Sequence, residues 1–555
     1  MTTDIILHFE ENLTYIAEIF KKRILNRSNI NVLFNKEFQA GAYNISLILD
    51  ENYSKDYKIE TIESKTVITG SSFINLVAGM GKVLHNIKFY KDYIIPCSKT
   101  GEYKANCEYR CVYFANHFYN YYQLASDESI KTYMEDLALW GYNNIASVLL
   151  PVINLFGKDD PHVDWFVQCV RRIYFNAKAL GMKYTALSHG NSDFKNQNLS
   201  IKAEPHPDPF GSRGHTGYLF CPSKPGATEY IKDLYKWIFE KVALPEIDYF
   251  VVWSYDEGGC GCKDCYPWIP GGLMKLYNCL KDDVNARYTN AKYILALWRM
   301  ADTETEEWEK IFEYLENHPN DFEYVMISTE KKFEKYPLSH RLPRKIIDFT
   351  EISMWSVFPW GGFGATVYPN HIRESLLPEM ALLSGGMLYS EGISEDINKA
   401  VCSSYYFKGN FELKEILEEY ISYEFSPDLT AEITELIMQF EKCQHDYAYE
   451  DGRIYDRNLA ENIKILAQKI NEHPSLKKDN PKWRMLFIAC QLEPERLAIL
   501  NKHNMPSVGH LPNSKEFSEE AKNLMAELNQ IYEYSGKYTG IESDNHSWVA
   551  PLPEG

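Results

Sequence analysis

The sequence lacks both a dense run of basic residues and a long apolar stretch. Its 58 Lys and Arg are outnumbered by 77 Asp and Glu, which gives a formal net charge of −19 at pH 7. A protein that grips phosphate backbones needs a basic surface, so we set nucleic acid aside as a partner. No stretch approaches the roughly 20 apolar residues of a membrane span. Residues 1–11 (MTTDIILHFEE) carry acids where a signal peptide carries bases, and we therefore expect a soluble, cytoplasmic protein with no membrane partner.

A glycine-rich phosphate turn, which usually marks an open doubly wound sheet, is missing as well. From about Glu108 the chain repeats a strand–loop–helix rhythm instead, and Ser126 and Gly141 are expected to begin and end the first helix of that series. Eight buried-type strands separated by helices over about 300 residues predict a closed (β/α)8 TIM barrel. We expect the strands at Arg110–Ala115, Asn144–Leu150, Lys183–Ser188, Tyr249–Tyr255, Lys292–Trp298, Tyr324–Ser328, Glu351–Trp355 and Gly386–Tyr389.

Two further regions flank this predicted barrel, since 555 residues are too many for one ordinary core. Residues 1–105 read as a small α/β domain, with a strand at Tyr57–Ile62 and an amphipathic helix at Phe73–Ile87. Residues 406–555 show helical apolar spacing throughout and no group with evident chemistry. We interpret them as a packing or oligomerisation domain, which leaves a homo-oligomer open. The barrel itself is expected to span residues 106–405.

The segment with the clearest chemistry follows the fourth predicted strand and reads YFVVWSYDEGGCGCKDCYPW from Tyr249 to Trp268. Asp256 and Glu257 lie just past the carboxyl end of that strand, where the active sites of such barrels are found. Close like charges raise one pKa, which gives a neutral acid beside an ionised carboxylate. Glycoside cleavage needs that division of labour. The other interpretation is a loop pair that accepts hydrogen bonds from nearby backbone amides.

The α/β domain before the barrel, the barrel entry EYRCVYF and the Asp-Glu pair after the fourth strand together resemble glycoside hydrolase family 20, the β-N-acetylhexosaminidase-like enzymes. The resemblance spans roughly residues 1–400 in layout and is confined to short motifs in sequence. It implies a substrate-assisted retaining mechanism, in which Asp256 stabilises the oxazoline formed by the 2-acetamido group and Glu257 protonates the leaving oxygen.

The resemblance also assigns substrate contacts. It matches Arg110 to the family's first-strand arginine, which holds sugar hydroxyls, and Trp298 and Trp355 to the rings that wall the acetamido pocket. The chain departs from the family's HxGGDE run, because Trp253-Ser254-Tyr255 precedes the acidic pair, and its Cys-rich continuation is not part of the family's pattern.

Three cysteines within six residues follow the acidic pair. Cys260, Cys262 and Cys265 have a spacing that suits zinc, which takes four ligands tetrahedrally and accepts thiolates. Cys221 is the predicted fourth ligand, because it ends the long loop after the third strand and neighbouring loops of a barrel are adjacent. Four thiolates would make one structural zinc; a ligand from His189, His206 or His215 would favour a catalytic metal, and three reduced thiols without metal are the remaining alternative. No organic cofactor is expected.

The same rim of the predicted barrel carries other polar candidates for binding a sugar. They follow the first, third and eighth strands, and each is equally interpretable as a structural group: His117, Asn120, His189, Asn191 and Glu391.

Two other functions stay open. One is a glycosidase of different specificity on the same fold, such as an α-glucuronidase-like enzyme or one that pairs Asp256 with Glu391. A glucuronidase needs basic residues for the uronate, and the candidates at the rim are few: Arg110, Arg213 and Arg299. The other is a non-catalytic carbohydrate-binding protein.

Overall fold

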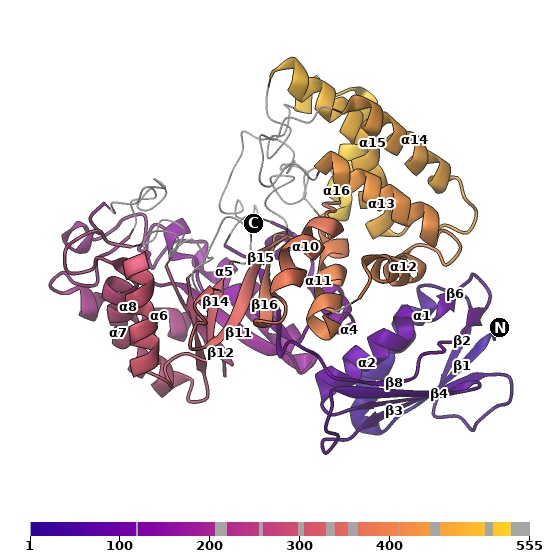
Figure 1. Cartoon of the computed structure of the whole chain (residues 1–555), viewed down its shortest axis with the longest axis horizontal. Coiled ribbons are helices and arrows are strands. Elements are labelled where there is room, and N and C mark those ends of the chain that lie inside the picture. The colour runs from indigo at the N-terminus through magenta and orange to yellow at the C-terminus, as the bar shows by residue number, and fades with distance from the viewer. Residues whose placement is uncertain are drawn as a thin grey trace.

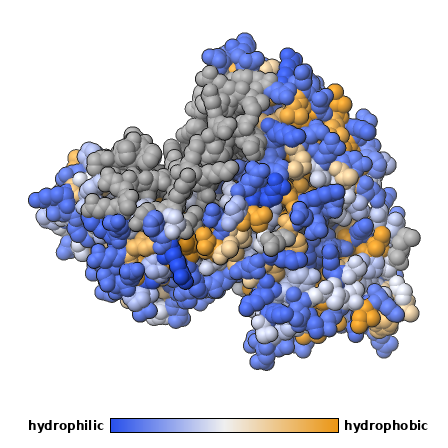
Figure 2. Space-filling view, viewed as in Figure 1, coloured by the Kyte–Doolittle hydropathy of each residue, from blue (hydrophilic) through white to orange (hydrophobic). Residues whose placement is uncertain are grey.

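A computed structural model describes residues 2–117, 120–205, 219–254, 259–297, 305–328, 339–352, 365–409, 411–444, 456–504 and 514–533. The chain forms an N-terminal sheet with helices, a closed barrel and a C-terminal group of helices (Figure 1). A continuous cluster of buried apolar side chains runs through all three parts. Most of the described surface in Figure 2 is hydrophilic, with smaller apolar patches over the C-terminal helices.

The N-terminal domain is a six-stranded sheet in the order β2-β1-β3-β5-β4-β8. Helices α1 (Thr14–Leu25) and α2 (Phe73–His85) cover the side that faces the rest of the molecule (Figure 1). Ser72 begins α2, and its side chain accepts a hydrogen bond from the amide of Asn75, as expected of a helix cap. The strands are β1 (Asp4–His8), β2 (Asn31–Phe34), β3 (Tyr43–Leu49), β4 (Tyr57–Ile62), β5 (Lys65–Gly70) and β8 (Gly101–Tyr103).

The barrel is closed by eight parallel strands in sequence order, with the last strand paired to the first, so the predicted fold class is confirmed. The strands are β9 (Tyr109–Phe114), β10 (Asn144–Val148), β11 (Lys183–His189), β12 (Tyr249–Trp253), β13 (Lys292–Ala296), β14 (Tyr324–Ile327), β15 (Lys345–Glu351) and β16 (Leu383–Ser390). The helices around them are α4 (Asp127–Leu139), α5 (Val163–Ala179), α6 (Ala227–Val242), α7 (Met274–Arg287), α8 (Thr305–Asn317), α10 (Pro369–Leu376) and α11 (Asp396–Lys408).

The seventh strand was predicted in the wrong place. It spans Lys345–Glu351 and ends at the residue where the prediction began it. The segment does not look like a buried strand in sequence, because the polar Asp348 interrupts its apolar run. In the structure the side chain of Asp348 is buried and accepts a hydrogen bond from Thr350. The correction moves Glu351 from the start of a strand to its carboxyl end.

Side chains that alternate along the strands fill the barrel interior. Four aromatic rings lie near the carboxyl ends of their strands: Tyr113, Trp253, Phe349 and Tyr389. Their centroids lie 5.6–6.3 Å apart in neighbouring pairs, mostly edge to face. This aromatic layer is the floor of the barrel mouth.

The C-terminal helices pack against one another in sequence order. They are α12 (Leu413–Glu424), α13 (Thr430–Gln444), α14 (Arg457–Asn471), α15 (Pro481–Lys502) and α16 (Glu519–Ile531). Helix α12 also packs on α2 and α11, which joins the helical part to the N-terminal domain and to the barrel. None of the helices in the described ranges is long and apolar enough to cross a membrane.

Candidate functional site

Several of the predicted site residues lie outside the described part of the chain. Asp256 and Glu257 fall in residues 255–258, Trp298 in 298–304 and Trp355 in 353–364, and the side chain of His189 is likewise outside it. Strand β12 ends at Trp253, whose ring belongs to the aromatic floor, so the acidic pair follows the floor by a few residues of chain.

Two buried glutamates reach the mouth from neighbouring strands. Glu351 ends β15, and Glu391 directly follows β16. Phe349 faces the barrel interior, and side chains two residues apart along a strand share a face, so the carboxylate of Glu351 points inward above the aromatic floor. Glu391 lies just past the end of β16, beside Tyr389 of the same floor. Glu351 is 6% exposed and Glu391 2%, and Tyr389 donates a hydrogen bond of 2.8 Å to Glu391. Glu391 was predicted as a rim residue, whereas Glu351 was missed because its strand was misplaced.

The turn that carries Glu391 is held by a second, buried carboxylate. Glu395 Oε1 accepts the backbone amide of Glu391 at 3.2 Å and the hydroxyl of Ser390 at 2.5 Å. Lys399, one helical turn further on, is fully buried at 3.4 Å from Glu395 and donates to the carbonyl of Gly392 at 2.6 Å. Burial lowers the pKa of Lys399, and the charge of Glu395 opposes that shift. The pair fixes the backbone beneath Glu391 and leaves that carboxylate directed at the mouth.

His117 and Asn120, predicted after the first strand, lie at the carboxyl end of the barrel, but their side chains make different contacts. His117 is buried and its Nδ1 lies 2.8 Å from the hydroxyl of Tyr113 in the aromatic floor. Asn120 donates to the carbonyl of Ala115 at 2.8 Å and accepts the amide of Tyr122 at 3.0 Å. Its side chain therefore shapes the loop, while His117 stays adjacent to the mouth.

Arg110 lies apart from the other candidates. It is the second residue of β9, at the amino end of the strand, and its neighbours Tyr109 and Cys111 occupy the interior, so its own side chain points outward. The guanidinium donates to the carbonyls of Gly141 and Cys107, each at 2.7 Å. The alternation of the strand thus gives Arg110 a packing role beneath the helices, and we leave it out of the proposed site.

The four cysteines come together as their spacing and the order of the barrel loops predict. The sulfurs of Cys221, Cys260, Cys262 and Cys265 all lie within 4.8 Å of one another. Cys221 Sγ is 3.7 Å from Cys262 Sγ and 3.6 Å from Cys265 Sγ. Four sulfurs bound tetrahedrally at about 2.3 Å from one zinc would be about 3.8 Å apart, so the thiols fit this metal.

The surroundings of the sulfurs also suit thiolates. The amide of Glu204 donates to Cys260 Sγ at 3.3 Å, and the hydroxyl of Ser223 lies 3.1 Å from Cys265 Sγ. Hydrogen bonds with Cys221 and Cys265 lower the pKa of Cys260, whereas the contacts of Cys265 with Cys221 and Cys260 raise the pKa of Cys265. A first negative charge is therefore favoured and further ones are opposed, and a dication would compensate the further charges.

The cysteine cluster ties together the loops that follow β11 and β12. Phe220, next to Cys221, donates its amide to the carbonyl of Asn191, and Gly261 donates its amide to the carbonyl of Glu204. On the other side of the acidic pair, Trp268 Nε1 donates to Ser254 Oγ at 2.6 Å. Gly259 packs so closely on Trp268 that a Cβ there would lie 1.7 Å from the ring. The segment with Asp256 and Glu257 is thus anchored at both ends.

Comparisons with known proteins give similarity in structure alone. No family model matches the sequence, and no curated protein matches it. Among solved structures, a family 115 4-O-methyl-α-glucuronidase with specificity for decorated arabinogalactans matches with a TM-score of 0.58 and 9% identity, over 97% of this chain and 78% of its own.

Two further solved structures extend this likeness. A family 89 glycoside hydrolase from Clostridium perfringens, in complex with its substrate GlcNAc-α-1,4-galactose, has a TM-score of 0.58 and 12% identity over 94% of this chain and 65% of its own. The family 20 β-N-acetylhexosaminidase of Streptomyces coelicolor has a TM-score of 0.50 and 11% identity over 78% of this chain and 92% of its own. The chain has the barrel architecture that glycoside hydrolases of several families share.

Proposed function

We propose that the protein is a glycoside hydrolase whose active site is the mouth of the barrel. The observation that carries this proposal is the convergence of carboxylates there. Glu351 and Glu391 are buried above an aromatic floor, and Asp256 and Glu257 follow the end of β12. Paired carboxylates in a desolvated pocket provide the acid and the nucleophile or stabiliser of glycoside cleavage. The barrel architecture shared with glycoside hydrolases supports the same reaction class.

The finer proposal is removal of a terminal 2-acetamido sugar by substrate-assisted, retaining catalysis. Glu257 acts as general acid and base on the leaving oxygen, and Asp256 holds the acetamido group while positive charge develops on the oxazoline. Trp298 and Trp355 wall the acetamido pocket, and His117, His189 and Glu391 bind sugar hydroxyls. Two of the similar structures, a β-N-acetylhexosaminidase and a family 89 enzyme in complex with GlcNAc-α-1,4-galactose, are in line with such a substrate.

Glu351 favours a second candidate, a glycosidase in which a protein carboxylate attacks the sugar directly. The position of Glu351 is suitable, because it points into the mouth from β15 while the acidic pair follows β12. Such an enzyme would have no need of a 2-acetamido group, and its specificity would extend to glucosides or glucuronides. Glu391 is the alternative partner for Asp256 in this mechanism.

A screen of nitrophenyl glycosides with the wild-type protein and Glu257→Gln tests the function. We expect turnover of N-acetylhexosaminides, loss of that turnover in the variant, and a product that retains its anomeric configuration by NMR. Equal cleavage of glucosides or glucuronides, or inversion, would contradict the substrate-assisted mechanism. Absence of activity on every glycoside would leave carbohydrate binding without catalysis.

We also propose that Cys221, Cys260, Cys262 and Cys265 hold one structural zinc that fixes the segment of the acidic pair. The sulfur distances fit tetrahedral coordination, and four thiolates leave no position open for catalysis. The thiols must stay reduced for this role, in keeping with the predicted cytoplasmic location.

A further inference from the structure

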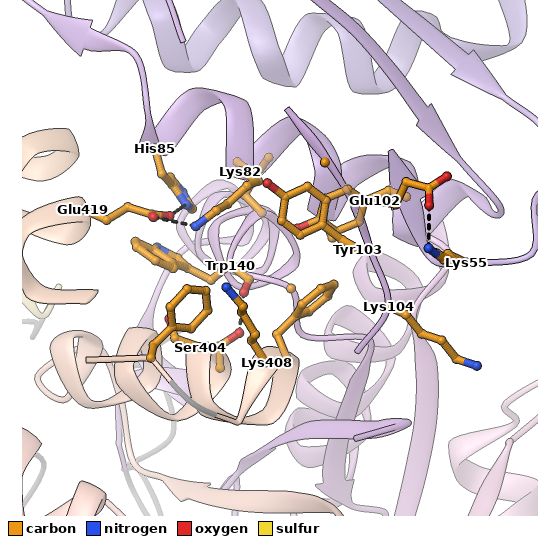
Figure 3. Close-up of a pocket in the computed structure, with 18 of the residues that line it drawn as sticks. Lys55, Lys82, His85, Glu102, Tyr103, Lys104, Trp140, Ser404, Lys408 and Glu419 are labelled. Atoms are coloured by element: carbon orange, nitrogen blue, oxygen red, sulfur yellow. Dashed lines mark hydrogen bonds and ion pairs between the residues drawn. The ribbon is translucent and has the colours of Figure 1, made fainter. Parts of the chain in front are cut away.

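A cavity of ≈ 500 Å³ lies where the N-terminal domain, the barrel and the C-terminal helices meet (Figure 3). Its walls come from β4, α2 and β8, from the ends of α4 and α11, and from α12. Helices of a (β/α)8 barrel run back against the strands, so the ends of α4 and α11 lie at the amino ends of the strands, opposite the mouth. The cavity is therefore separate from the proposed active site.

The walls of the cavity are largely aromatic. Tyr57 and Tyr103 are stacked with centroids 4.7 Å apart, and Phe407 lies 5.4 Å from Tyr57. Trp140, half-buried at the end of α4, stacks on His85 at 3.8 Å. These rings are held by one another before any ligand enters, and such flat walls accept either an aromatic ring or the apolar face of a sugar ring.

The charge inside the cavity is positive although the protein is acidic as a whole. Lys82 and Lys408 extend toward the centre from opposite sides, while Lys104 points away (Figure 3). Lys82 is paired with Glu419 at 2.5 Å. Lys408 lies 4.5 Å from the centroid of the Phe411 ring and has no ion-pair partner in the described ranges. Lys55 and Glu102, which also line the cavity, are paired with each other. Apart from Lys104, the walls therefore carry one ammonium group more than carboxylates, which favours an anion.

One buried polar atom in the wall adds to this picture. His85 is 3% exposed, and within the described part of the chain its Nε2 has no hydrogen-bond partner. Burial lowers the pKa of His85 to about 3, so the ring is neutral near pH 7 even though Glu419 lies 3.8 Å from its Nδ1. An unsatisfied buried nitrogen costs about 1–3 kcal/mol, and a hydroxyl or amino group of a ligand would remove that cost.

We propose that this cavity binds a small ring-bearing phosphate, with the ring against Tyr103 and Trp140 and the phosphate at Lys408 and Lys82. A nucleoside monophosphate and a sugar phosphate share this chemistry, and the test separates them. Because the ligand would contact all three parts of the chain, its binding stabilises their assembly. The proposal is independent of the hydrolysis proposed for the barrel mouth.

Isothermal titration calorimetry with AMP, glucose 6-phosphate and inorganic phosphate tests the site. We expect one-to-one binding of at least one ring-bearing phosphate, with inorganic phosphate at least about tenfold weaker because it lacks the ring contact. Lys408→Gln should weaken binding by about tenfold or more, the scale of one charge-assisted hydrogen bond. Lys469→Gln, a change at another exposed lysine on α14, is the matched control and should bind as the wild type does.

Three results would overturn the proposal. They are no binding of either ring-bearing phosphate at millimolar concentration, equal binding of inorganic phosphate, or unchanged affinity in Lys408→Gln. If the phosphate binds in the barrel mouth instead, the affinity of Lys408→Gln will be unchanged. Lys408 is exposed, so its replacement leaves the fold intact, and equal melting temperatures of the two variants without ligand verify this.

Discussion

Buried carboxylates are costly in a protein core, and such groups mark sites with a chemical task. Glu351 and Glu391 occupy such positions above an aromatic floor. Both carboxylates are withdrawn from water, and a low local dielectric would strengthen their electrostatic interactions with the sugar of the proposed function. The individual roles of the carboxylates are separable by conservative replacements.

Replacing Glu257 with Gln removes the proton donor and keeps the shape of the side chain. We expect kcat/KM to fall by roughly 10²–10⁴-fold for sugars whose leaving group needs an acid. Activated nitrophenyl substrates should lose less. Asp256→Asn should instead slow all substrates alike, because it acts on the acetamido nucleophile; a comparison of both leaving-group classes measures the difference.

Replacing Glu351 with Gln distinguishes the two mechanisms. In the substrate-assisted mechanism Glu351 binds a hydroxyl, and we expect kcat/KM to fall by less than about tenfold, the scale of one hydrogen bond. If Glu351 is the nucleophile, turnover of every substrate should be lost. Steady-state kinetics on nitrophenyl N-acetylglucosaminide, with Glu257→Gln alongside, decides between them.

At the scale of elements, the loops after β11 and β12 matter more than their strands. They are joined through the cysteine cluster, through the hydrogen bond between Trp268 and Ser254, and through backbone bonds such as that from Gly261 to Glu204. A loop that carries catalytic groups must hold them within fractions of an ångström, and a metal cross-link does so without a large core.

Purified protein should therefore contain one zinc ion per chain when its metal content is measured by mass spectrometry. We expect Cys262→Ser to lose most of that zinc and to lower activity and melting temperature, since metal binding contributes to folding. Cys279→Ser is the matched control, because Cys279 is also half-buried but lies on α7 and donates only to the carbonyl of Thr228. Protein that is active without stoichiometric zinc would contradict the assignment.

The whole molecule is held together by buried ion pairs as well as by its continuous apolar core. Arg23 Nε on α1 is 2.8 Å from Asp136 on α4, and Arg27 is 2.9 Å from Glu424 on α12. Lys482 on α15 lies 2.8 Å from the same Glu424. These contacts connect the N-terminal domain, the barrel and the helical part, so we expect the three to unfold together.

Glu424→Gln should destabilise the protein by about 3–5 kcal/mol at pH 7, because it removes the buried ion-pair partner of Arg27 and leaves Lys482 with Asp396 and Asp136 alone. Burial by itself raises the pKa of Glu424, but the charges of Lys482 and Arg27 outweigh it, and the pKa is lowered. The unfolded value is about 4.3, so the stabilisation is fully present above that pH and is lost as the pH falls through the lower folded pKa.

Thermal unfolding at several pH values measures this effect. The wild type should lose stability between about pH 5 and pH 3 more steeply than Glu424→Gln does. Glu432→Gln, an exposed change on the adjacent α13, should follow the wild type throughout. Parallel curves for all three proteins would show that the Glu424 pairs contribute nothing to stability.

The features that could be predicted from the sequence depend on local interactions. The side chain of Ser126 caps α4 by accepting the amide of Ser129, and Gly141 follows the end of that helix with a φ of 98°, as the sequence predicted. Alternating runs of strand and helix specified the closed barrel, and cysteine spacing specified the thiol cluster. Caps, turns and periodicity act over a few residues, so they can be read along the chain.

Which side chains face the mouth depends on contacts between distant parts of the chain. Arg110 and Tyr109 are adjacent in sequence, yet the register of the barrel sends the ring inward and the guanidinium outward. Pairing with β16 fixes the end of β15 at Glu351 and thereby places this side chain at the mouth. Likewise, the cavity around Trp140 and Lys408 exists because three separate parts of the chain meet there. Register, closure and domain contact depend on residues far apart in sequence, and local preferences do not contain that information.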